Sequence, residues 1–282
     1  TNTPPTETTS VSGSKTWNDA DDQDGYRPDA ITVKLLANGE AVEGKTAIAD
    51  KTNDWSWSFT DLPKKSGGKD IIYSVDEKSF AGSDQYEKVP DGMNLTNTHV
   101  TEKIDITAKK VWSDADDQDG KRPGIVSVQL YANNEPVTGG AATLNAGNNW
   151  SYTWNALPKN NSGDAIIYSV VETNIPAGYT VHYAPESITG TSGTITVTNT
   201  HAPEKTSVSG TKTWDDDNDN DRKRPSSITV RLYADGDEVN HTTVQAAADG
   251  SWSYEFTNLD KYAGGEEIVY TLLLLQEFGM LR

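Results

Sequence analysis

Three polar residue types that can react with one another recur at matching places in two parts of the chain: a lysine, a glutamate and an asparagine. In chain order they are Lys15, Glu77 and Asn97, then Lys110, Glu172 and Asn199. A lysine amine that has lost its proton is a nucleophile, and a carboxyl group beside it can move protons and polarise a carbonyl. These residue types could therefore join the lysine and asparagine side chains through an amide bond, with release of ammonia.

Each of these residues shares a strand face with apolar neighbours, because side chains two positions apart point the same way. Lys15 stands two positions before Trp17, Asn97 stands two positions after Leu95, and the second copy repeats the pattern. Burial shifts a lysine toward the neutral amine and a glutamate toward the neutral acid, and folding would supply the proximity that a poor electrophile needs. The alternative interpretation is that each is a boundary residue whose polar tip reaches water.

The elements that carry these residues belong to a long repeat. Trp17, Trp112 and Trp214 each open a phrase in which acidic residues lead to an Arg-Pro pair, and the copies lie roughly 100 residues apart. Each copy continues with an alternating segment such as ITVKLLANG from Ile31 and an aromatic segment such as WSWSF from Trp55. Short runs of period two, broken by Gly, Asn, Asp and Pro, predict strands throughout. A repeat of this length predicts one small all-β sandwich per copy.

We therefore expect a tandem array. The expected boundaries are 1–7 for the tail of a preceding repeat, 8–101 for domain 1, 102–204 for domain 2 and 205–282 for domain 3. The third domain is expected to lack its last strand. Leu274 stands where the first two copies have a glutamate, and no closing asparagine follows, so no cross-link is predicted for Lys212.

Composition narrows the class of protein. The 282 residues include 34% hydrophobic and 23% charged residues, and the net charge is −18, from 42 acidic and 24 basic residues. Nucleic acid and anionic membrane surfaces need the opposite charge, so neither is an expected partner. No segment is long and apolar enough to span a bilayer. Cysteine is absent, so small extracellular domains would need another covalent device than a disulfide.

The acidic phrase suggests two interpretations. Clustered carboxylates suit a hard cation such as calcium, and the candidate ligands are Asp19, Asp22 and Asp24, with Asp114, Asp117 and Asp119 in the second copy. The spacing differs from that of the helix–loop–helix calcium site, and the phrase is also typical of a polar loop in which Asp and Asn form turns. We favour the loop, and no other cofactor is expected.

Enzyme motifs are missing from the sequence. The four histidines are scattered, and there is no glycine-rich phosphate loop, nucleophile elbow or zinc helix motif. Rows of aromatics such as Trp55, Trp57 and Phe59 are interpreted as sandwich core rather than as a sugar or base platform. We expect no enzymatic activity beyond a single self-crosslinking event in each domain.

The combination of KxW early, YxVxE late and TNT at the end of a copy, with DGxRP between, resembles the Cna B-type domains. Related domains build pilins and surface stalks of Gram-positive bacteria. The resemblance implies Greek-key β-sandwiches of the inverse immunoglobulin type. It also implies intramolecular isopeptide bonds, Lys15 to Asn97 with Glu77 and Lys110 to Asn199 with Glu172, in which the glutamates promote the reaction.

The predicted function is a structural stalk of a bacterial surface adhesin anchored in the cell wall, extracellular on a Gram-positive cell. Its partners would be the neighbouring repeats of the same chain. A host extracellular-matrix or cell-surface ligand would be bound by other regions of the parent protein. The alternative is a module that itself recognises a host protein or glycan, with calcium as a potential requirement.

Overall fold

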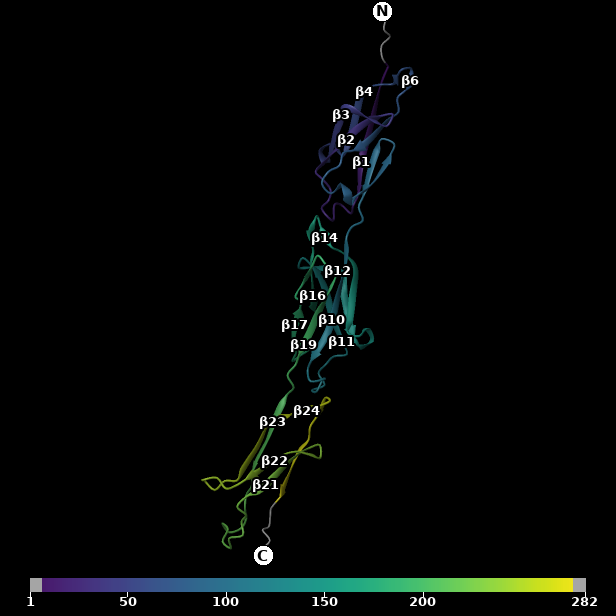
Figure 1. Cartoon of the computed structure of the whole chain (residues 1–282). Helices are drawn as coiled ribbons and strands as arrows, with labels where there is room; N and C mark the ends of the chain where they lie inside the picture. Colours follow the sequence, from purple (N-terminus) through teal and green to yellow (C-terminus); the bar gives the residue numbers. More distant parts are fainter. Residues whose placement is uncertain (1–6, 276–282) are drawn as a thin grey trace, which may run out of the picture.

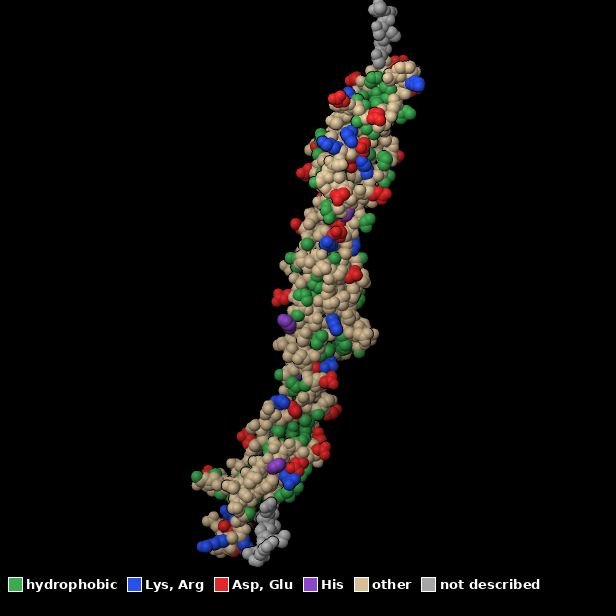
Figure 2. Space-filling view, in the orientation of Figure 1, with side chains coloured by type: hydrophobic (Ala, Val, Ile, Leu, Met, Phe, Trp, Pro, Cys, Tyr) green, Lys and Arg blue, Asp and Glu red, His purple; other side chains and the backbone are tan. Residues whose placement is uncertain are grey.

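Three β-domains follow one another along an extended chain in the computed structural model, which describes residues 7–275 (Figure 1). Figure 2 shows charged and apolar side chains distributed in small groups along the visible face. Most of the predicted tail of a preceding repeat, and the end of the chain after Leu275, lie outside the described residues. Within residues 7–275, no helix is long and apolar enough to cross a membrane.

Domain 1 packs a four-stranded sheet, in the order β4-β1-β9-β8, against a three-stranded sheet, in the order β3-β2-β7, and adds the small hairpin β5–β6. Its strands are β1 (Thr8–Asn18), β2 (Ala30–Ala37), β3 (Glu40–Asp50), β4 (Ser56–Pro63), β5 (Lys65–Ser66), β6 (Lys69–Asp70), β7 (Tyr73–Glu77), β8 (Glu87–Asp91) and β9 (Asn94–Thr98). Two short 3-10 helices, η1 (Lys51–Asn53) and η2 (Ser83–Gln85), lie in its loops.

Domain 2 repeats this arrangement with sheets β13-β10-β19-β17 and β12-β11-β16-β18 and the hairpin β14–β15. Its strands are β10 (Lys103–Ser113), β11 (Ile125–Ala132), β12 (Glu135–Asn145), β13 (Ser151–Pro158), β14 (Asn160–Asn161), β15 (Asp164–Ala165), β16 (Ile167–Glu172), β17 (Thr180–Ala184), β18 (Ile188–Thr189) and β19 (Gly193–Thr200). The 3-10 helix η3 (Ala146–Asn148) corresponds to η1.

Domain 3 has the pair β20–β23, the sheet β22-β21-β26 and the hairpin β24–β25. Its strands are β20 (Lys205–Thr211), β21 (Ile228–Ala234), β22 (Asp237–Val244), β23 (Ser253–Asp260), β24 (Tyr262–Ala263), β25 (Glu266–Glu267) and β26 (Tyr270–Leu275). In the described part of the chain, β20 pairs only with β23.

Alternation along the strands builds a separate core in each domain. In β2, Ile31, Val33 and Leu35 are buried while the residues between them are partly exposed. The core-forming interpretation of the aromatic strand is confirmed for Trp57 and Phe59, which are both buried. Such burial of large apolar side chains supplies the main driving force for folding.

One aromatic residue differs from the prediction. Tyr152 is 42% exposed, and its ring meets Trp154 edge-on with the centroids 5.1 Å apart. Trp154 itself is buried. The two residues share one face of β13, so the core covers this face at Trp154 but not at Tyr152.

The first and last strands of domains 1 and 2 run parallel to each other, which brings their distant sequence segments into contact. In β1 and β9, Lys15 lies opposite Leu95 and Trp17 lies opposite Asn97. In β10 and β19, Lys110 and Trp112 pair in the same way with the residues of the closing strand. A parallel pair cannot be joined by a tight hairpin, so in the sequence all the other strands of the domain come between these two.

Candidate functional site

The lysine, glutamate and asparagine predicted from the sequence meet in the interior of domain 1. Lys15, Glu77 and Asn97 are 5%, 6% and 1% exposed. Lys15 and Asn97 come from the parallel strands of one sheet, and Glu77 comes from β7 of the facing sheet, where it lies opposite Val33 of β2. The Lys15 Nζ is 3.0 Å from Glu77 Oε1, and Asn97 Nδ2 donates to Glu77 Oε2 over 2.9 Å.

Domain 2 has the same arrangement. Lys110, Glu172 and Asn199 are all buried. Asn199 Nδ2 donates to Glu172 Oε1 over 2.9 Å, and Lys110 Nζ is 3.7 Å from Glu172 Oε2. The lysine amine also lies 3.3 Å from the carbonyl oxygens of Val111 and Val197. The boundary interpretation, in which the polar tips reach water, is therefore wrong for both domains.

Burial is the main influence on the two amines. It lowers the pKa of Lys15 below its ordinary value, and the Glu77 carboxylate opposes that change. Burial lowers the pKa of Lys110 to about 8, against the opposing effect of Glu172. A lysine with such a pKa is more readily deprotonated at neutral pH, and its neutral amine is a nucleophile.

Two further features of the site bear on its chemistry. The Lys15 amine lies 4.5 Å from the centre of the Trp17 ring, and Lys110 lies 4.1 Å from that of Trp112. The carbonyl oxygens Oδ1 of Asn97 and Asn199 are both buried, and neither has a hydrogen-bond partner among residues 7–275. Each site therefore combines an amine, a carboxyl group that reaches both partners and an amide carbonyl held away from water.

Domain 3 lacks the acid. Leu274 lies opposite Val230, the register position that Glu77 occupies opposite Val33 in domain 1. Lys212 is only partly buried and lies just after the end of β20, and its amine donates to the carbonyl oxygen of the next residue, Thr213, over 2.6 Å. This domain therefore does not assemble the three groups within the described residues.

The acidic loops are tied down by an arginine and a tyrosine. Asp114 accepts hydrogen bonds from Arg122 Nε and Nη2, at 3.0 and 2.6 Å, and from the Tyr179 hydroxyl at 2.8 Å. Asp19, Arg27 and Tyr86 form the same group in domain 1. The hydrogen bonds from Arg122 are the largest influence that lowers the pKa of Asp114, to about 2.

The next aspartates of these loops bind other partners. Asp119 Oδ2 lies 2.8 Å from His201 Nε2 and accepts the backbone N–H of Glu204 over 2.8 Å. Asp24 makes the corresponding contacts in domain 1. The hydrogen bond to Asp119 is the main cause that raises the pKa of His201.

The remaining calcium candidates serve as turn residues. Asp22 and Asp117 each accept the backbone N–H of the arginine five positions later, at 2.9 and 2.8 Å. In the part of the chain that the structure describes, no group of three or more His, Cys, Asp or Glu side chains is arranged to hold a metal ion. Calcium binding by these loops stays a hypothesis.

Sequence reasoning missed three contributors to these sites. They are the indole rings of Trp17 and Trp112, the tyrosines that bind the acidic loops, and the histidines of the TNTH segments. The repeat itself carried a signal for the last group, because His99 and His201 stand at matching positions of the two copies. The partner of each histidine is far away in the sequence, so alternation within one strand could not reveal it.

Comparison with known proteins places the chain in a family. The model of the Cna protein B-type domain matches residues 11–98, 106–200 and 208–273. The collagen adhesin of Staphylococcus aureus is 41% identical over 268 residues, which are 95% of this chain and 22% of that protein. The chain thus spans less than a quarter of the curated relative that it matches.

A solved structure shows the same relationship. The crystal structure of two B repeat units of the collagen-binding protein of Staphylococcus aureus is 39% identical to this chain, with a TM-score of 0.56. The alignment covers 95% of this chain and 69% of the solved one.

We predict that calcium does not change the thermal stability of the chain, because the carboxylates of its acidic loops are already bound by arginine, tyrosine, histidine and backbone groups. The measurement is the melting temperature in excess chelator and again in millimolar calcium. An increase with calcium that disappears in an Asp22→Asn, Asp117→Asn double variant would instead establish these loops as binding sites.

We also predict that Asp114 stabilises domain 2 in a pH-dependent way. Its pKa is lowered to about 2, so its contribution is present above the ordinary value near 4 and disappears as the pH falls from about 4 to about 2. Asp114→Asn should lower the free energy of unfolding by about 2 kcal/mol at neutral pH, and by little at pH 2, measured by calorimetry. Asp116→Asn, at a fully exposed neighbour, is the control. Equal losses at both pH values would contradict this role.

Proposed function

Because this chain belongs to the family of Cna protein B-type domains, we propose that it is part of the stalk of an adhesin on the surface of a Gram-positive bacterium. We propose further that domains 1 and 2 are each closed by an intramolecular isopeptide bond. The observation that carries the proposal is the burial of one lysine, one glutamate and one asparagine in contact with one another, repeated in both domains.

The proposed reaction is a transfer of the asparagine acyl group from nitrogen to nitrogen. The Lys15 amine passes one proton to Glu77 and attacks Cγ of Asn97 as a neutral nucleophile. A C–N bond forms to Lys15 Nζ, the bond from Cγ to Nδ2 breaks, and Glu77 supplies the proton with which Nδ2 leaves as ammonia. Glu77 then takes the second proton from Nζ, which leaves a neutral amide between the two side chains. The reaction needs no oxidant, metal or cofactor. Glu77 suits this role because its two oxygens face the amine and the leaving nitrogen.

Folding provides most of the rate enhancement in this proposal. An unstrained amide is a poor electrophile, but fixed neighbours can reach effective concentrations far above those in solution. The low polarity around the site disfavours both charged groups and so favours the neutral amine. In domain 1, a cavity of about 170 Å³ lined in part by Glu77, Tyr86 and Asn97 offers a route by which ammonia can leave.

The bond would make each domain resistant to being pulled apart. It would join the first strand to the last and so close a loop of roughly 80 to 90 residues, worth about 4 to 5 kcal/mol by the loop-entropy model of cross-links. A force applied to the two ends of a domain would pass through the amide. An amide is also indifferent to reducing agents, which suits a chain that has no cysteine.

The extended arrangement of domains supports a spacer role (Figure 1). The matched relative is a collagen adhesin, and this chain spans 22% of its length. We therefore propose that a host ligand is bound by other regions of the parent protein, that the parent is anchored in the cell wall, and that this segment projects its binding region from the cell.

We predict that the intact mass of the purified chain is lower than the sequence mass by two molecules of ammonia. Lys110→Ala should remove one of the two losses, since it deletes the nucleophile of domain 2, and Glu172→Ala should do the same through loss of the proton carrier. The measurement is high-accuracy mass spectrometry of the whole chain. Peptide mapping should find Lys15 linked to Asn97, and Lys110 linked to Asn199.

Lys212→Ala is the matched control, because it removes the corresponding lysine of domain 3, where Leu274 replaces the acid. This variant should keep both losses of ammonia. A wild-type mass equal to that of the bare sequence would refute the bonds while leaving the tandem fold intact.

A further inference from the structure

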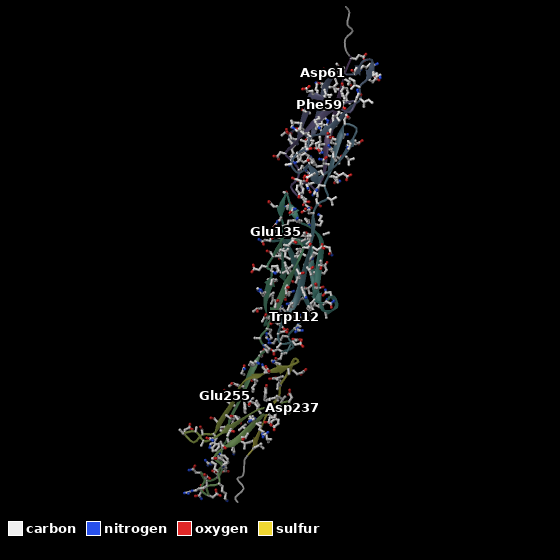
Figure 3. The ribbon with its side chains drawn as sticks, in the orientation of Figure 1. Phe59, Asp61, Trp112, Glu135, Asp237 and Glu255 are labelled. Carbon is white, nitrogen blue, oxygen red and sulfur yellow. The ribbon has the colours of Figure 1, made fainter. Side chains whose placement is uncertain are left out.

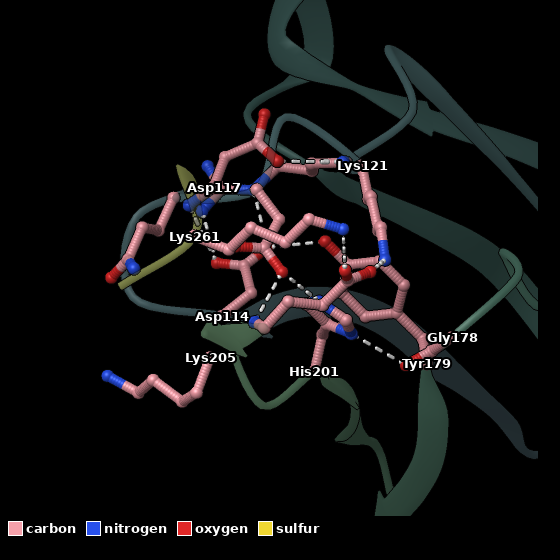
Figure 4. Close-up of polar contacts among 12 residues, drawn as sticks. Asp114, Asp117, Lys121, Gly178, Tyr179, His201, Lys205 and Lys261 are labelled. Atoms are coloured by element: carbon pink, nitrogen blue, oxygen red, sulfur yellow. Dashed lines mark hydrogen bonds and ion pairs between the residues drawn. The ribbon is translucent and has the colours of Figure 1, made fainter. Parts of the chain in front are cut away.

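Both junctions between domains are built around one buried aspartate of the acidic loop. Asp119, which is 7% exposed, accepts from the backbone N–H of Glu204 in the linker to domain 3 and contacts His201, which follows the closing strand. Figure 4 shows His201 at this junction, with Gly178 and Tyr179 beside it. Asp24, which is 6% exposed, makes the same two contacts at the junction of domains 1 and 2. One carboxylate thus ties together the loop, the end of its own domain and the linker that follows.

The histidine at each junction bridges two acceptors. His201 Nδ1 lies 2.8 Å from the carbonyl oxygen of Gly178, and Nε2 lies 2.8 Å from Asp119 Oδ2. A carbonyl oxygen and a carboxylate both accept, so each ring nitrogen donates when the ring carries both protons, and the pair favours that charged form of His201. This orientation explains how the carboxyl group is held at the junction although water is largely excluded.

The same loop also contacts the next domain directly. The backbone N–H of Gly265, in the turn of hairpin β24–β25, donates to the carbonyl oxygen of Gln118 over 3.0 Å. The side chain of Gln118 donates to Asp260 of domain 3 over 2.9 Å. At the first junction, Gly163 donates to Gln23 in the same way over 3.2 Å. The loop of each domain therefore docks on a hairpin of its successor.

Two glycines meet at each of these docking contacts. A Cβ atom built on Gly120 would lie 2.6 Å from the Cα of Gly265, and one built on Gly25 would lie 2.5 Å from the Cα of Gly163. Both distances are too short for any side chain to fit without displacement of the backbone. Gly120 also has a φ of +64°, a conformation that favours glycine. The close approach of the hairpin thus depends on the sequence Asp-Gly in the loop.

Charged side chains surround the second junction on several sides. Glu204 of the linker pairs with Lys121 of the loop at 2.5 Å and with Lys261 of the next domain at 3.1 Å. At the first junction, Glu102 pairs with Lys159 at 2.6 Å. These exposed pairs add little individually, but they connect the linker to the following domain and, at the second junction, to the loop as well.

We propose that each Asp-Gly loop, docked on the linker and hairpin of the following domain, forms a lock that fixes the orientation of consecutive domains. The partner that this loop recognises is another domain of the same family. The loop binds a backbone N–H of the linker that leads to that domain, and it packs against a hairpin whose turn contains glycine. The lock acts between domains, so it goes beyond the proposed cross-links within them and stands on its own contacts.

The acidic loop of the third domain lacks the glycine that this docking requires. Asp221 corresponds to Asp119, but Arg222 occupies the place of Gly120, and its φ is +58°. A side chain at this place would collide with a hairpin docked in the manner of the two junctions. The lock is therefore selective, and the loop of domain 3 is not built to dock a further domain in this way.

The test measures how much domains 2 and 3 move relative to each other in the full chain. Glu135→Cys and Asp237→Cys introduce spin labels at exposed strand starts of the two domains (Figure 3), and the native chain has no cysteine to interfere. Pulsed electron paramagnetic resonance should give a narrow distribution of distances between the two spin labels when the chain is otherwise unaltered. Gly120→Arg, which copies domain 3, and Asp119→Ala should each widen it at least about twofold, since linked domains move freely unless their interface is strong.

Matched substitutions away from the lock serve as controls. Asp221→Ala removes the corresponding aspartate of domain 3, and Gly39→Ala alters a glycine of positive φ with no atom near its Cβ position; both should leave the distribution narrow. Calorimetry checks that each variant is folded, and small-angle scattering of the unlabelled chains provides a second measurement of bending. Unchanged widths in folded Gly120→Arg and Asp119→Ala, or an equally broad distribution before substitution, would overturn the proposal. Neither outcome would affect the mass test of the cross-links.

Discussion

The parallel contact between the first and last strands of a domain is the constraint from which the candidate chemistry follows. It sets Lys15 and Asn97 two register positions apart on one sheet, while the facing sheet delivers Glu77 between them. Burying an ammonium and a carboxylate costs several kcal/mol for each ion, even when they are paired. An amide bond would replace this arrangement by neutral groups. The site is thus easier to explain as the precursor of a cross-link than as a stabilising ion pair.

Domain 3 shows the lysine without its partners, because the described residues include neither the glutamate nor a closing strand paired with β20. Its lysine keeps the position next to a tryptophan, 4.3 Å from the ring centre, as in the other domains. Without an acid at position 274, the Lys212 amine bonds to the carbonyl oxygen of Thr213. The contact with the tryptophan is therefore kept although Lys212 lies beyond the end of β20, but it does not by itself create a buried reactive group. The facing sheet must contribute the carboxyl group.

Much of this fold could be predicted from the sequence, because alternation specifies the buried face of a strand and the repeat specifies the domain. The parity of Lys15, Glu77 and Asn97 was sufficient to predict that all three face the interior, and the resemblance to the Cna B-type domains supplied their grouping. The roles of Asp24 and Asp119 were not accessible in the same way. Their partners include a backbone N–H of the linker and a hairpin of the next domain, and neither has a side-chain signature. A cluster of aspartates therefore suggested a metal site, whereas its members separately bind an arginine, a histidine and backbone groups.

The two devices act against different kinds of deformation. A covalent link between the terminal strands would oppose stretching of a domain, since the load would bypass the strands between them. It would leave bending at the linkers unaffected. The docked Asp-Gly loops oppose bending, because they connect a domain to a hairpin of its successor as well as to the linker. A stalk that must keep a binding region away from a cell wall needs resistance to both deformations. In this chain, the residues for the second device, Asp24 and Asp119, stand only seven to nine positions after the lysine and tryptophan of the first, so a single phrase at the start of each of the first two repeats contributes to both.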